Sequence, residues 1–527
     1  MTATTSAAPR RILFHLSPFA SQKILTFHLW WICDPQWRSR FQSVLEELYP
    51  GSEFAVCCNT ETMTILSKRG CTFEREWRAF TLDQSETLDH FKYHTLESLN
   101  HWHRTGTNND HGRYLGAKML EKFGGWTPDL VFSFLPAPYL RDIWPDARIV
   151  YLESSVFSRE PYPWTYYFDV LGTMQNAFLS RYAALVNAQT APPETLRKLS
   201  EYRTRTAALF ERQTRVKEYF AELRKRFRHI FLFACNLDHY FGVEAFSPYE
   251  TQFEFLEHVL SVVPADTAVV VTQHPEPATA PLPERCLNDL RDVYPNLVAD
   301  DFFFNMANPS QCSLAFADGV ITQMSTVGLQ AAFHRKYFVS IGTYFTGIAD
   351  CTDLNDFGAM LERPPKDRDA FFAWTLTHYA IPEQRLAEFL PGMLDRMKSL
   401  PGCAPEAVLA DWEPFPGDVF AEVYFPHLER MEQTWRQGFA ENRSVPSVLR
   451  RLLTDREAEL GRANGALAAC REELDRRDAL IRLRDHELKS AESSVSFRLG
   501  RILTWPLRTL RDILVGGKKN AGKADPT

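Results

Sequence analysis

Short apolar runs alternate with amphipathic stretches over residues 10–160. The runs are rich in β-branched and aromatic side chains, which predicts strands, and the stretches between them repeat apolar residues at helical spacing. The predicted strands are residues 11–17, 53–58, 129–134 and 148–153. Strand and helix in regular alternation favour a parallel, doubly wound sheet.

A second alternating series begins at residue 229, after a charged, periodic segment that predicts helices over 173–225. Its predicted strands are residues 229–235, 268–273, 319–322 and 337–342, with helices at about 250–263, after Pro309 and over 326–333. We therefore expect an α/β protein with two Rossmann-like domains facing a cleft. Ligands of open α/β sheets bind beyond the carboxyl ends of the strands, so functional residues should directly follow strands.

The pattern changes at about residue 445, where one leucine or isoleucine recurs every seven residues and predicts a long heptad helix. These positions are Leu453, Leu460, Leu467, Leu474, Ile481 and Leu488. A coiled coil needs a second apolar position in each heptad, three residues after the first. Here that position carries arginine, alanine and cysteine, which makes a weak core. Homo-oligomerisation through 445–495 and a single helix that packs on another surface therefore both stay open.

We expect six parts along the chain. They are an N-terminal Rossmann-like domain (1–172), a helical connection (173–225), a C-terminal Rossmann-like domain (226–400), a helical return segment (401–444), the heptad helix (445–495) and a basic amphipathic tail (496–527).

Composition narrows the class of protein. The 527 residues exceed what one core usually holds, and 45% hydrophobic with 24% charged residues is a globular composition. The net charge of −7 argues against a dedicated nucleic-acid binder, so we expect no nucleic-acid partner. Ten cysteines without a CxxC pair or a zinc spacing favour a reducing, cytoplasmic location.

Charge is concentrated in the tail, where seven Lys or Arg and one Asp lie between Arg498 and Lys523 and give a local charge of +6. Leucines and isoleucines at mostly helical spacing accompany these arginines over 496–519. An apolar face beside arginines and Trp505 suits a helix that lies on an anionic membrane surface, which would place the protein peripherally on the inner face of the membrane. Docking of this helix on the acidic body of its own chain is the alternative. No apolar window approaches the length of a membrane-spanning helix.

Polar residues follow the predicted strands of the second series. His274 and Pro275 come directly after the strand at 268–273, which presents an imidazole that could contact a phosphate or exchange a proton. A histidine that simply ends the strand and bonds a loop is the alternative. Ser325 and Thr326 precede a helix, whose free amides and dipole make an anion site, although an ordinary N-cap serine fits equally.

Three further polar residues belong to the same predicted edge. Asn236 and Asp238 follow the strand at 229–235, and Gln323 follows the strand at 319–322. Asp238 could bind a sugar hydroxyl, accept a proton or cap the next helix.

The first series offers a separate carboxylate. Glu153 closes a predicted strand, and Arg159 and Asp169 follow in an aromatic-rich loop that suits sugar stacking and a shifted carboxylate pKa. A Glu153–Arg159 ion pair that holds the loop is the alternative.

The order of these motifs resembles bacterial capsule polysaccharide biosynthesis proteins, which are two-Rossmann (GT-B type) glycosyltransferases and include Kdo transferases. The matching pieces are NxD, then HP, then DGxIT followed by ST and GLxA, over about 225–345, with a looser match over 125–172. This resemblance implies a first domain that binds the acceptor glycan or glycolipid and a second that binds the nucleotide-sugar. It also implies that His274, Pro275, Ser325 and Thr326 hold the donor phosphate, and we add Asn236 and Gln323 to this donor-binding set.

The resemblance makes Glu153 and Asp238 the candidate catalytic acids, and we assign Arg159 and Asp169 to the acceptor. Glu153 is similar to the first acid of an acidic–acidic–Gly loop, but Ser154 and Ser155 replace the second acid and the glycine. The implied activity is a metal-independent hexosyl or Kdo-type transferase without a cofactor, using a nucleotide-sugar of the CMP-linked kind. A sugar-nucleotide epimerase, a polyol-phosphate transferase and a non-catalytic scaffold of a polysaccharide assembly complex are the alternatives.

Overall fold

The computed structural model describes residues 9–16, 35–68, 77–92, 94–237, 240–273, 282–304, 306, 308–398, 400 and 402–440, together with Arg471, Arg477, Arg482 and Lys489. The chain divides into two compact units, residues 1–435 and 436–527. The first unit holds both sheets, and all that follows concerns it.

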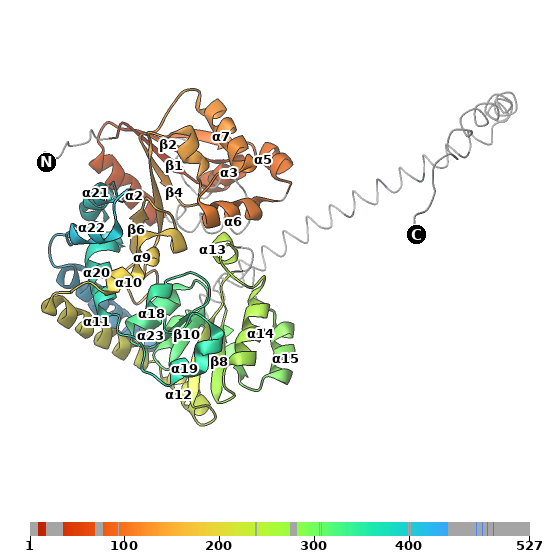
Figure 1. The fold of residues 1–527 in the computed structure, drawn as a ribbon, viewed down its shortest axis with the longest axis vertical. Helices are drawn as coiled ribbons and strands as arrows, with labels where there is room; N and C mark the ends of the chain where they lie inside the picture. The colour runs from red at the N-terminus through yellow and green to blue at the C-terminus, as the bar shows by residue number, and fades with distance from the viewer. Residues whose placement is uncertain are drawn as a thin grey trace. The chain divides into compact units, whose positions relative to one another are not determined.

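The first sheet has the strand order β12-β6-β5-β4-β1-β2-β3 in the described residues. Its strands are β1 (Arg11–His15), β2 (Glu53–Asn59), β3 (Arg78–Leu82), β4 (Leu130–Ser133), β5 (Arg148–Ser154), β6 (Thr165–Asp169) and β12 (Ile381–Pro382). The pairs among β1 to β5 are parallel, as the alternating pattern predicts. With the helices packed on it, this sheet forms what we call the first lobe (Figure 1).

Three strands of this sheet escape sequence analysis, and one of them is the edge strand β3. The segment that we expected to be an aromatic-rich loop after Glu153 contains β6, which pairs antiparallel with β5. The short strand β12 pairs antiparallel with β6. It lies inside the range 226–400 that we expected to form the second domain, yet it completes the first sheet. Helix α21 (Leu386–Met397), which follows it, packs against α2 (Pro35–Leu48) of the first lobe.

The second sheet is parallel in all its pairs, in the order β11-β10-β7-β8-β9 among the described residues. Its strands are β7 (His229–Ala234), β8 (Thr267–Thr272), β9 (Leu297–Val298), β10 (Gly319–Thr322) and β11 (Tyr337–Ser340). Strand β8 is buried along its whole length, which explains its continuous apolar run. This sheet and its helices form the second lobe (Figure 1). The expected α/β class with two Rossmann-like sheets is confirmed.

Helices cover both sheets. In the first lobe they are α2, α3 (Thr60–Lys68), α5 (Gln84–Phe91), α6 (Thr95–Thr105), α7 (Asp110–Phe123) and α8 (Tyr139–Ile143). In the second they are α13 (Phe241–Glu244), α14 (Gln252–Val262), α15 (Glu284–Val293), α16 (Asp301–Phe304), α17 (Pro309–Leu314), α18 (Thr326–Phe333) and α19 (Phe357–Leu361). Four helices connect the lobes in sequence: α9 (Phe178–Arg181), α10 (Ala183–Asn187), α11 (Pro193–Glu211) and α12 (Thr214–Arg224). After the second lobe come α20 (Asp369–Trp374), α21, α22 (Pro405–Ala410) and α23 (Phe425–Ala440).

Local signals in the sequence set several helix boundaries. Asn109 caps α7 by accepting a hydrogen bond from the Gly112 amide at 3.0 Å, and Gly124 ends that helix in the left-handed conformation. Thr251 caps α14 by accepting a hydrogen bond from the Glu254 amide at 3.1 Å. Gly328 lets α18 lie close to the second sheet, because a Cβ there would overlap the Phe338 ring of β11. These features are short-range and can be read from sequence.

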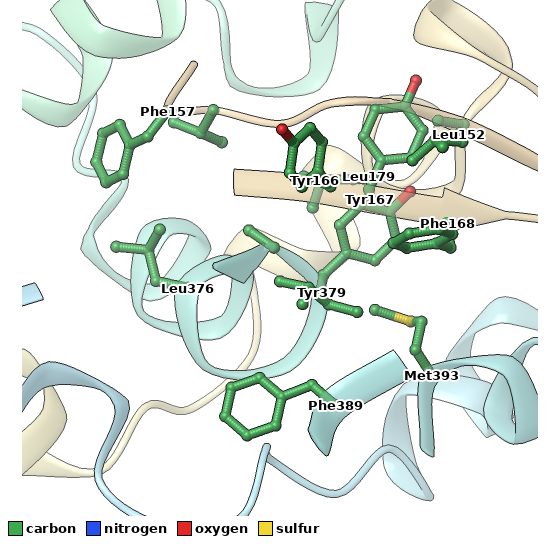
Figure 2. Packing of buried hydrophobic residues seen from close by; sticks show 14 of the residues in the cluster. Leu152, Phe157, Tyr166, Tyr167, Phe168, Leu179, Leu376, Tyr379, Phe389 and Met393 are labelled. Carbon is green, nitrogen blue, oxygen red and sulfur yellow. The ribbon is translucent and has the colours of Figure 1, made fainter. Parts of the chain in front are cut away.

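Buried side chains join the two lobes. One hydrophobic cluster runs from the first sheet to Leu329 and Phe333 of α18 and includes Tyr379. Figure 2 shows Tyr379 beside Tyr167 of β6, with Phe389 from α21 also in the cluster. The rings of Tyr167 and Tyr379 are stacked with their centroids 5.7 Å apart. The lobes therefore share packed side chains at their junction.

Polar contacts at the junction run through α6 and α13. The Gln175 amide donates to the Gly242 carbonyl at 2.6 Å, and its carbonyl oxygen lies 2.9 Å from Nε2 of His103. Asn100 donates to Glu244 at 3.1 Å. Burial lowers the pKa of His103 to about 4, so this histidine is neutral at pH 7 and bridges the lobes as a hydrogen-bonding group.

Candidate active site

The hairpin of β5 and β6 positions Glu153. Strand β4 ends at Ser133, which pairs with Tyr151, so β5 continues beyond the neighbouring strand by three residues. In that extension Glu153 pairs with Tyr167 of the antiparallel strand β6. Paired residues of an antiparallel ladder lie on the same face of the sheet, so the carboxylate and the phenol are neighbours.

Only one oxygen of Glu153 has hydrogen-bond partners. Oε1 accepts from the Ser154 amide at 2.7 Å and from the Ser154 hydroxyl at 3.0 Å. Oε2 is buried and has no hydrogen-bond partner among the described residues, and the residue as a whole is 6% exposed. Burial raises the pKa of Glu153 to about 7, and the two hydrogen bonds from Ser154 partly oppose this rise.

Three tyrosines surround this carboxylate. Tyr167 comes from β6, whereas Tyr240 and Tyr344 come from the second lobe. Burial raises the pKa of each phenol, and the charge of Glu153 raises it further. Sequence analysis missed Tyr240 and Tyr344, because no local pattern shows that residues about 90 and 190 positions away cover a strand end. It missed Tyr167 because it did not predict β6, the strand that pairs this residue with Glu153.

Glu153 lines a cavity of about 20 Å³ between elements of both lobes. The second lobe contributes Leu329 of α18 together with Tyr344 and Phe345. A space of this size holds about one water molecule. Glu153, whose Oε2 has no hydrogen-bond partner among the described residues, therefore lies beside a small void where the two lobes meet.

The start of α18 lies one turn from this cavity. Ser325 precedes Leu329 by four residues, which places both on the same face of the helix, about 6 Å apart along its axis. The Ser325 hydroxyl accepts a hydrogen bond from the Val327 amide at 3.3 Å, which is the N-cap arrangement. Both Ser325 and Thr326 are half-exposed, and the Thr326 hydroxyl has no hydrogen-bond partner among the described residues. Their part in donor binding stays a prediction.

A buried polar network holds the adjoining strand ends of the second sheet. The side-chain amide of Asn236 donates to the Thr322 hydroxyl at 3.3 Å, and its backbone amide donates to the side-chain oxygen of Gln252 at 3.0 Å. Gln252 donates in turn to Gln323 at 2.5 Å, and Gln323 contacts Ser247. Asn236 and Gln323 are thus brought to one edge, as predicted, with side chains that bond to the protein itself.

Asp169, at the end of β6, differs from Glu153 in its partners. It is fully buried, and its oxygens accept from the Leu171 amide at 2.7 Å, the Phe178 amide at 2.6 Å and the Tyr379 hydroxyl at 2.6 Å. Burial raises the pKa of Asp169 to about 6, and these hydrogen bonds oppose the rise. These contacts brace the turn after β6. We predicted that Asp169 binds the acceptor, but both of its oxygens already accept hydrogen bonds from the protein.

Arg159 lies in the loop between β5 and β6. No ion pair joins it to Glu153 among the described residues, so the loop is not held by the bridge that we considered. Burial lowers the pKa of its guanidinium. Its half-buried side chain has no hydrogen-bond partner in the described part of the chain, and its acceptor role stays a prediction.

Several predicted residues fall outside the described ranges. These are Asp238, His274 and Pro275, the heptad positions from Leu453 to Leu488, and the tail at 496–519. Within the described ranges, no group of three His, Cys, Asp or Glu side chains converges as metal ligands would, and no helix has the length and apolar character to cross a membrane. Metal independence and membrane association stay predictions.

Residues 152–385 match the family model of capsule polysaccharide biosynthesis proteins, and this range contains Glu153 and the start of α18. The chain carries a capsule polysaccharide biosynthesis region. The match begins one residue before Glu153 and ends just after β12, so it covers the end of β5, strand β6 and the whole second sheet. The resemblance expected from the motifs is confirmed.

Solved structures match this chain at low similarity. KpsC of Thermosulfurimonas dismutans, a β-Kdo 2,7 transferase, is 14% identical, with a TM-score of 0.34 over 66% of this chain and 100% of that chain. The calicheamicin glycosyltransferase CalG4 is 14% identical, with a TM-score of 0.31 over 73% and 98%. The UDP-GlcNAc 2-epimerase of Methanocaldococcus jannaschii is 12% identical, with a TM-score of 0.26 over 68% and 95%. These values are too low to assign an activity. No curated protein matches the chain.

Proposed function

We propose that this protein is a glycosyltransferase of surface polysaccharide synthesis, in which Glu153 is the general base that activates the acceptor hydroxyl. The observation that carries the proposal is the state of Glu153. It is a buried carboxylate with one oxygen fixed by Ser154, the other unpartnered, and a pKa raised to about 7. A base performs best when its pKa lies near the working pH.

The transfer step needs one proton acceptor and one stabilised leaving group. Oε2 of Glu153 takes the proton of the acceptor hydroxyl as that oxygen forms a bond to the anomeric carbon of the donor sugar. The bond from the anomeric carbon to the donor phosphate breaks, and the nucleotide leaves with the electron pair. Ser154 holds Oε1, so that the reacting oxygen keeps a fixed direction.

The leaving nucleotide needs its negative charge offset, and α18 begins beside the Glu153 cavity with two half-exposed hydroxyl residues. Helix N-termini favour anions, because unpaired amides and the helix dipole act together there. The donor phosphate would bind at Ser325 and Thr326, with His274 as a further contact. A monophosphate leaving group, as in a CMP-linked acidic sugar such as Kdo, requires no more charge than these groups supply.

Access to Glu153 requires movement of the side chains that cover it. A cavity of about 20 Å³ cannot hold a sugar ring, so Tyr344 and Phe345 have to withdraw from Glu153 to admit the acceptor. Both residues belong to the second lobe, which is also the lobe that would bind the donor. Their withdrawal and return would exclude water from the reacting groups.

The test measures transfer and nucleotide affinity in the same protein. Full-length wild type and Glu153→Gln are incubated with CMP-, CDP-, UDP- and GDP-sugars, with and without capsular oligosaccharide acceptors. We expect transfer from one donor class in the wild type. In Glu153→Gln the turnover should fall by about 10³-fold, within the range typical of general bases, with unchanged nucleotide affinity.

Three results would contradict the proposal. Near-normal transfer by Glu153→Gln would remove Glu153 as the base. Conversion of the donor alone, without acceptor, would identify an epimerase. Nucleotide affinity without transfer to any glycan tested would favour a scaffold. The matched control is Glu97→Gln, a change of the same chemistry in an exposed residue of α6 that pairs with His94.

A further inference from the structure

A second cavity, of about 500 Å³, lies close to the Glu153 cavity and has no part in the proposed reaction. Small-molecule sites span roughly 300–1,000 Å³, so it is large enough for a ligand. Its walls include Trp374 and Trp412, and we call it the indole pocket. Tyr379, which lines the Glu153 cavity, packs against Trp374 and Trp412 with ring centroids 6.2 and 6.1 Å apart. The two cavities therefore share one aromatic wall.

Aromatic packing makes this wall rigid. Trp374 and Trp412 meet edge to face at 5.2 Å. The His378 ring is stacked parallel on Trp374, also at 5.2 Å and with an interplanar angle of 4°. Phe415, another lining residue, is stacked on Phe389 of α21 at 4.4 Å. Such a wall keeps its shape when the pocket is empty, which lowers the cost of binding.

His378, one of the lining residues, leaves an uncharged hydrogen-bond acceptor without a partner in the described part of the chain. The Thr377 hydroxyl donates to the Ala373 carbonyl at 2.6 Å. Nδ1 of His378 lies 2.7 Å from that hydroxyl and 3.1 Å from the Trp374 carbonyl, so Nδ1 carries the proton and Nε2 is left as an acceptor. Burial lowers the pKa of His378 to about 4, which keeps the ring neutral at pH 7. Among the described residues, Nε2 has no hydrogen-bond partner.

Gln189, another lining residue, adds a second acceptor. Its amide nitrogen donates to the Leu185 carbonyl at 3.0 Å, which orients its carbonyl oxygen away from that bond. Two uncharged acceptors beside an aromatic wall match a ligand that combines hydroxyl donors with an apolar face. A purely apolar ligand would bury these acceptors without partners, which costs free energy.

The charges of the pocket cancel. Lys198 lines it, and its ammonium group lies 2.5 Å from Asp418, a lining residue, and 3.4 Å from Glu194. Among the described lining residues, no other Lys or Arg is present. An anionic ligand would therefore find no uncompensated cation, and a cationic ligand would find the carboxylate of Asp418 already engaged.

We propose that the indole pocket binds a neutral sugar unit. A pyranose ring supplies hydroxyl donors for His378 and Gln189 and an apolar face for the aromatic wall, without a charge. Because the pocket shares its wall with the Glu153 cavity, this sugar would be an internal unit of the acceptor glycan. The proposal that the pocket binds a sugar does not depend on the proposed function. The identification of this sugar as a unit of the acceptor rests on the proposed function.

The test measures binding without any transfer. Full-length protein is titrated with cellobiose, maltotriose, lactose and N,N′-diacetylchitobiose, and binding is followed by saturation-transfer NMR and calorimetry. We expect at least one of these neutral sugars to bind, and His378→Ala to weaken its binding tenfold or more. Gln189→Ala, in a partly exposed loop residue, should weaken the same sugar about threefold and gives a second reading if His378→Ala unfolds. Thermal melting identifies any loss of fold.

The matched control is His258→Ala. His258 lies on α14 of the second lobe, where its Nδ1 contacts the Tyr249 hydroxyl at 2.6 Å, and it does not line the pocket. This variant should bind the sugar as the wild type does. Glu153→Gln should also bind it normally, so that loss of transfer and loss of sugar binding are distinguished.

Four outcomes would overturn the proposal. One is that none of the neutral sugars binds, and another is that His378→Ala and His258→Ala bind them equally well. A third is that glucuronic acid binds as tightly as the neutral sugars, which would contradict the charge balance. The last is that an apolar dye fills the pocket and no sugar displaces it, which would assign the pocket to an apolar partner.

Discussion

Glu153 and Asp169 end neighbouring strands of one sheet and are both buried, yet their surroundings differ. Asp169 accepts hydrogen bonds from two amides and one phenol, which use both of its oxygens. Glu153 has partners for Oε1 only, and all of them come from Ser154. A buried carboxylate with satisfied oxygens serves the fold, whereas one that keeps an unpartnered oxygen is free to react. The four predictions below test this difference.

The largest effect expected is on stability at high pH. The carboxyl of Glu153 has an ordinary pKa of 4.5, and burial raises it to about 7 in the folded chain. Between these values the folded state binds more protons than the unfolded state, so stability falls as the pH rises. Glu153→Gln removes this penalty and should be more stable than wild type at pH 8 by on the order of 3 kcal/mol.

Urea unfolding of both proteins at pH 8 and pH 4 measures this effect. At pH 4 the carboxyl is mostly protonated in both states, so the free energies of unfolding of the two proteins should differ only slightly. A difference of the same size at both pH values would contradict the raised pKa.

The second effect is on the rate of transfer. Only ionised Glu153 can accept a proton, so kcat/KM, which reports the free enzyme, should rise with pH through about 7. The ionised fraction, and with it kcat/KM, should increase about a hundredfold from pH 5 to pH 8. The measurement is kcat/KM for the acceptor at saturating donor over this range. A flat profile would exclude Glu153 as the titrating base.

The third effect concerns the satisfied acid. Tyr379→Phe removes the hydroxyl that donates to Asp169 at 2.6 Å, and it should destabilise the protein by about 2 kcal/mol, the usual value for a hydrogen bond to a charged group. The pKa of Asp169, about 6 in the folded chain, already includes the lowering by this hydrogen bond. Its removal should raise that pKa further, so the loss of stability should be larger at pH 8 than at pH 5. Thermal and urea unfolding at both pH values measure it.

Tyr344→Phe is the control for this loss. Tyr344 is also buried and adjoins Glu153, but its hydroxyl makes no hydrogen bond among the described residues. Its removal should change stability far less. Equal losses of stability in the two variants would mean that the hydrogen bond from Tyr379 to Asp169 contributes nothing beyond the loss of any buried hydroxyl.

The smallest effect is on the midpoint of the rate profile. Ser154→Ala removes the hydroxyl that donates to Oε1 of Glu153 at 3.0 Å. Because this bond lowers the pKa of Glu153, its loss should move the midpoint of the kcat/KM profile upward by about half a pH unit. Ser154→Thr keeps the hydroxyl and should leave the midpoint in place. A fall in kcat without a shift would assign Ser154 a purely structural role.

The principal parallel strands and helix α18 follow from local patterns, and the structure confirms them within a few residues. Strand β6 could not be predicted from local patterns, because its fully buried aromatic run TYYFD has no polar alternation and follows a loop rich in proline. Strand β12 has two residues, and only its pairing with β6 defines it. Short strands that complete a sheet from a distant part of the chain have no signal of their own.

The candidate site divides in the same way. The sequence singled out Glu153 as a carboxylate at a strand end, and the family match covers it. Nothing local distinguished it from Asp169, since both acids end short apolar segments. The distinction arises from Tyr240 and Tyr344 on the other lobe and from Tyr379 below β6. A pKa depends on the dielectric and hydrogen bonds around a group, and folding brings these from residues far apart in sequence.

The sequence by itself determined the two α/β sheets, the resemblance of the central region to capsule polysaccharide biosynthesis proteins, and the residue types that follow each strand. These are short-range properties, because strand and helix periodicity and motif spacing are written within about twenty residues. The tertiary structure decided which of two buried acids keeps an unpartnered oxygen, and it formed the indole pocket from segments around 190, 375 and 415. Burial and the satisfaction of hydrogen bonds are properties of the packed chain, so they exist only once distant segments have met.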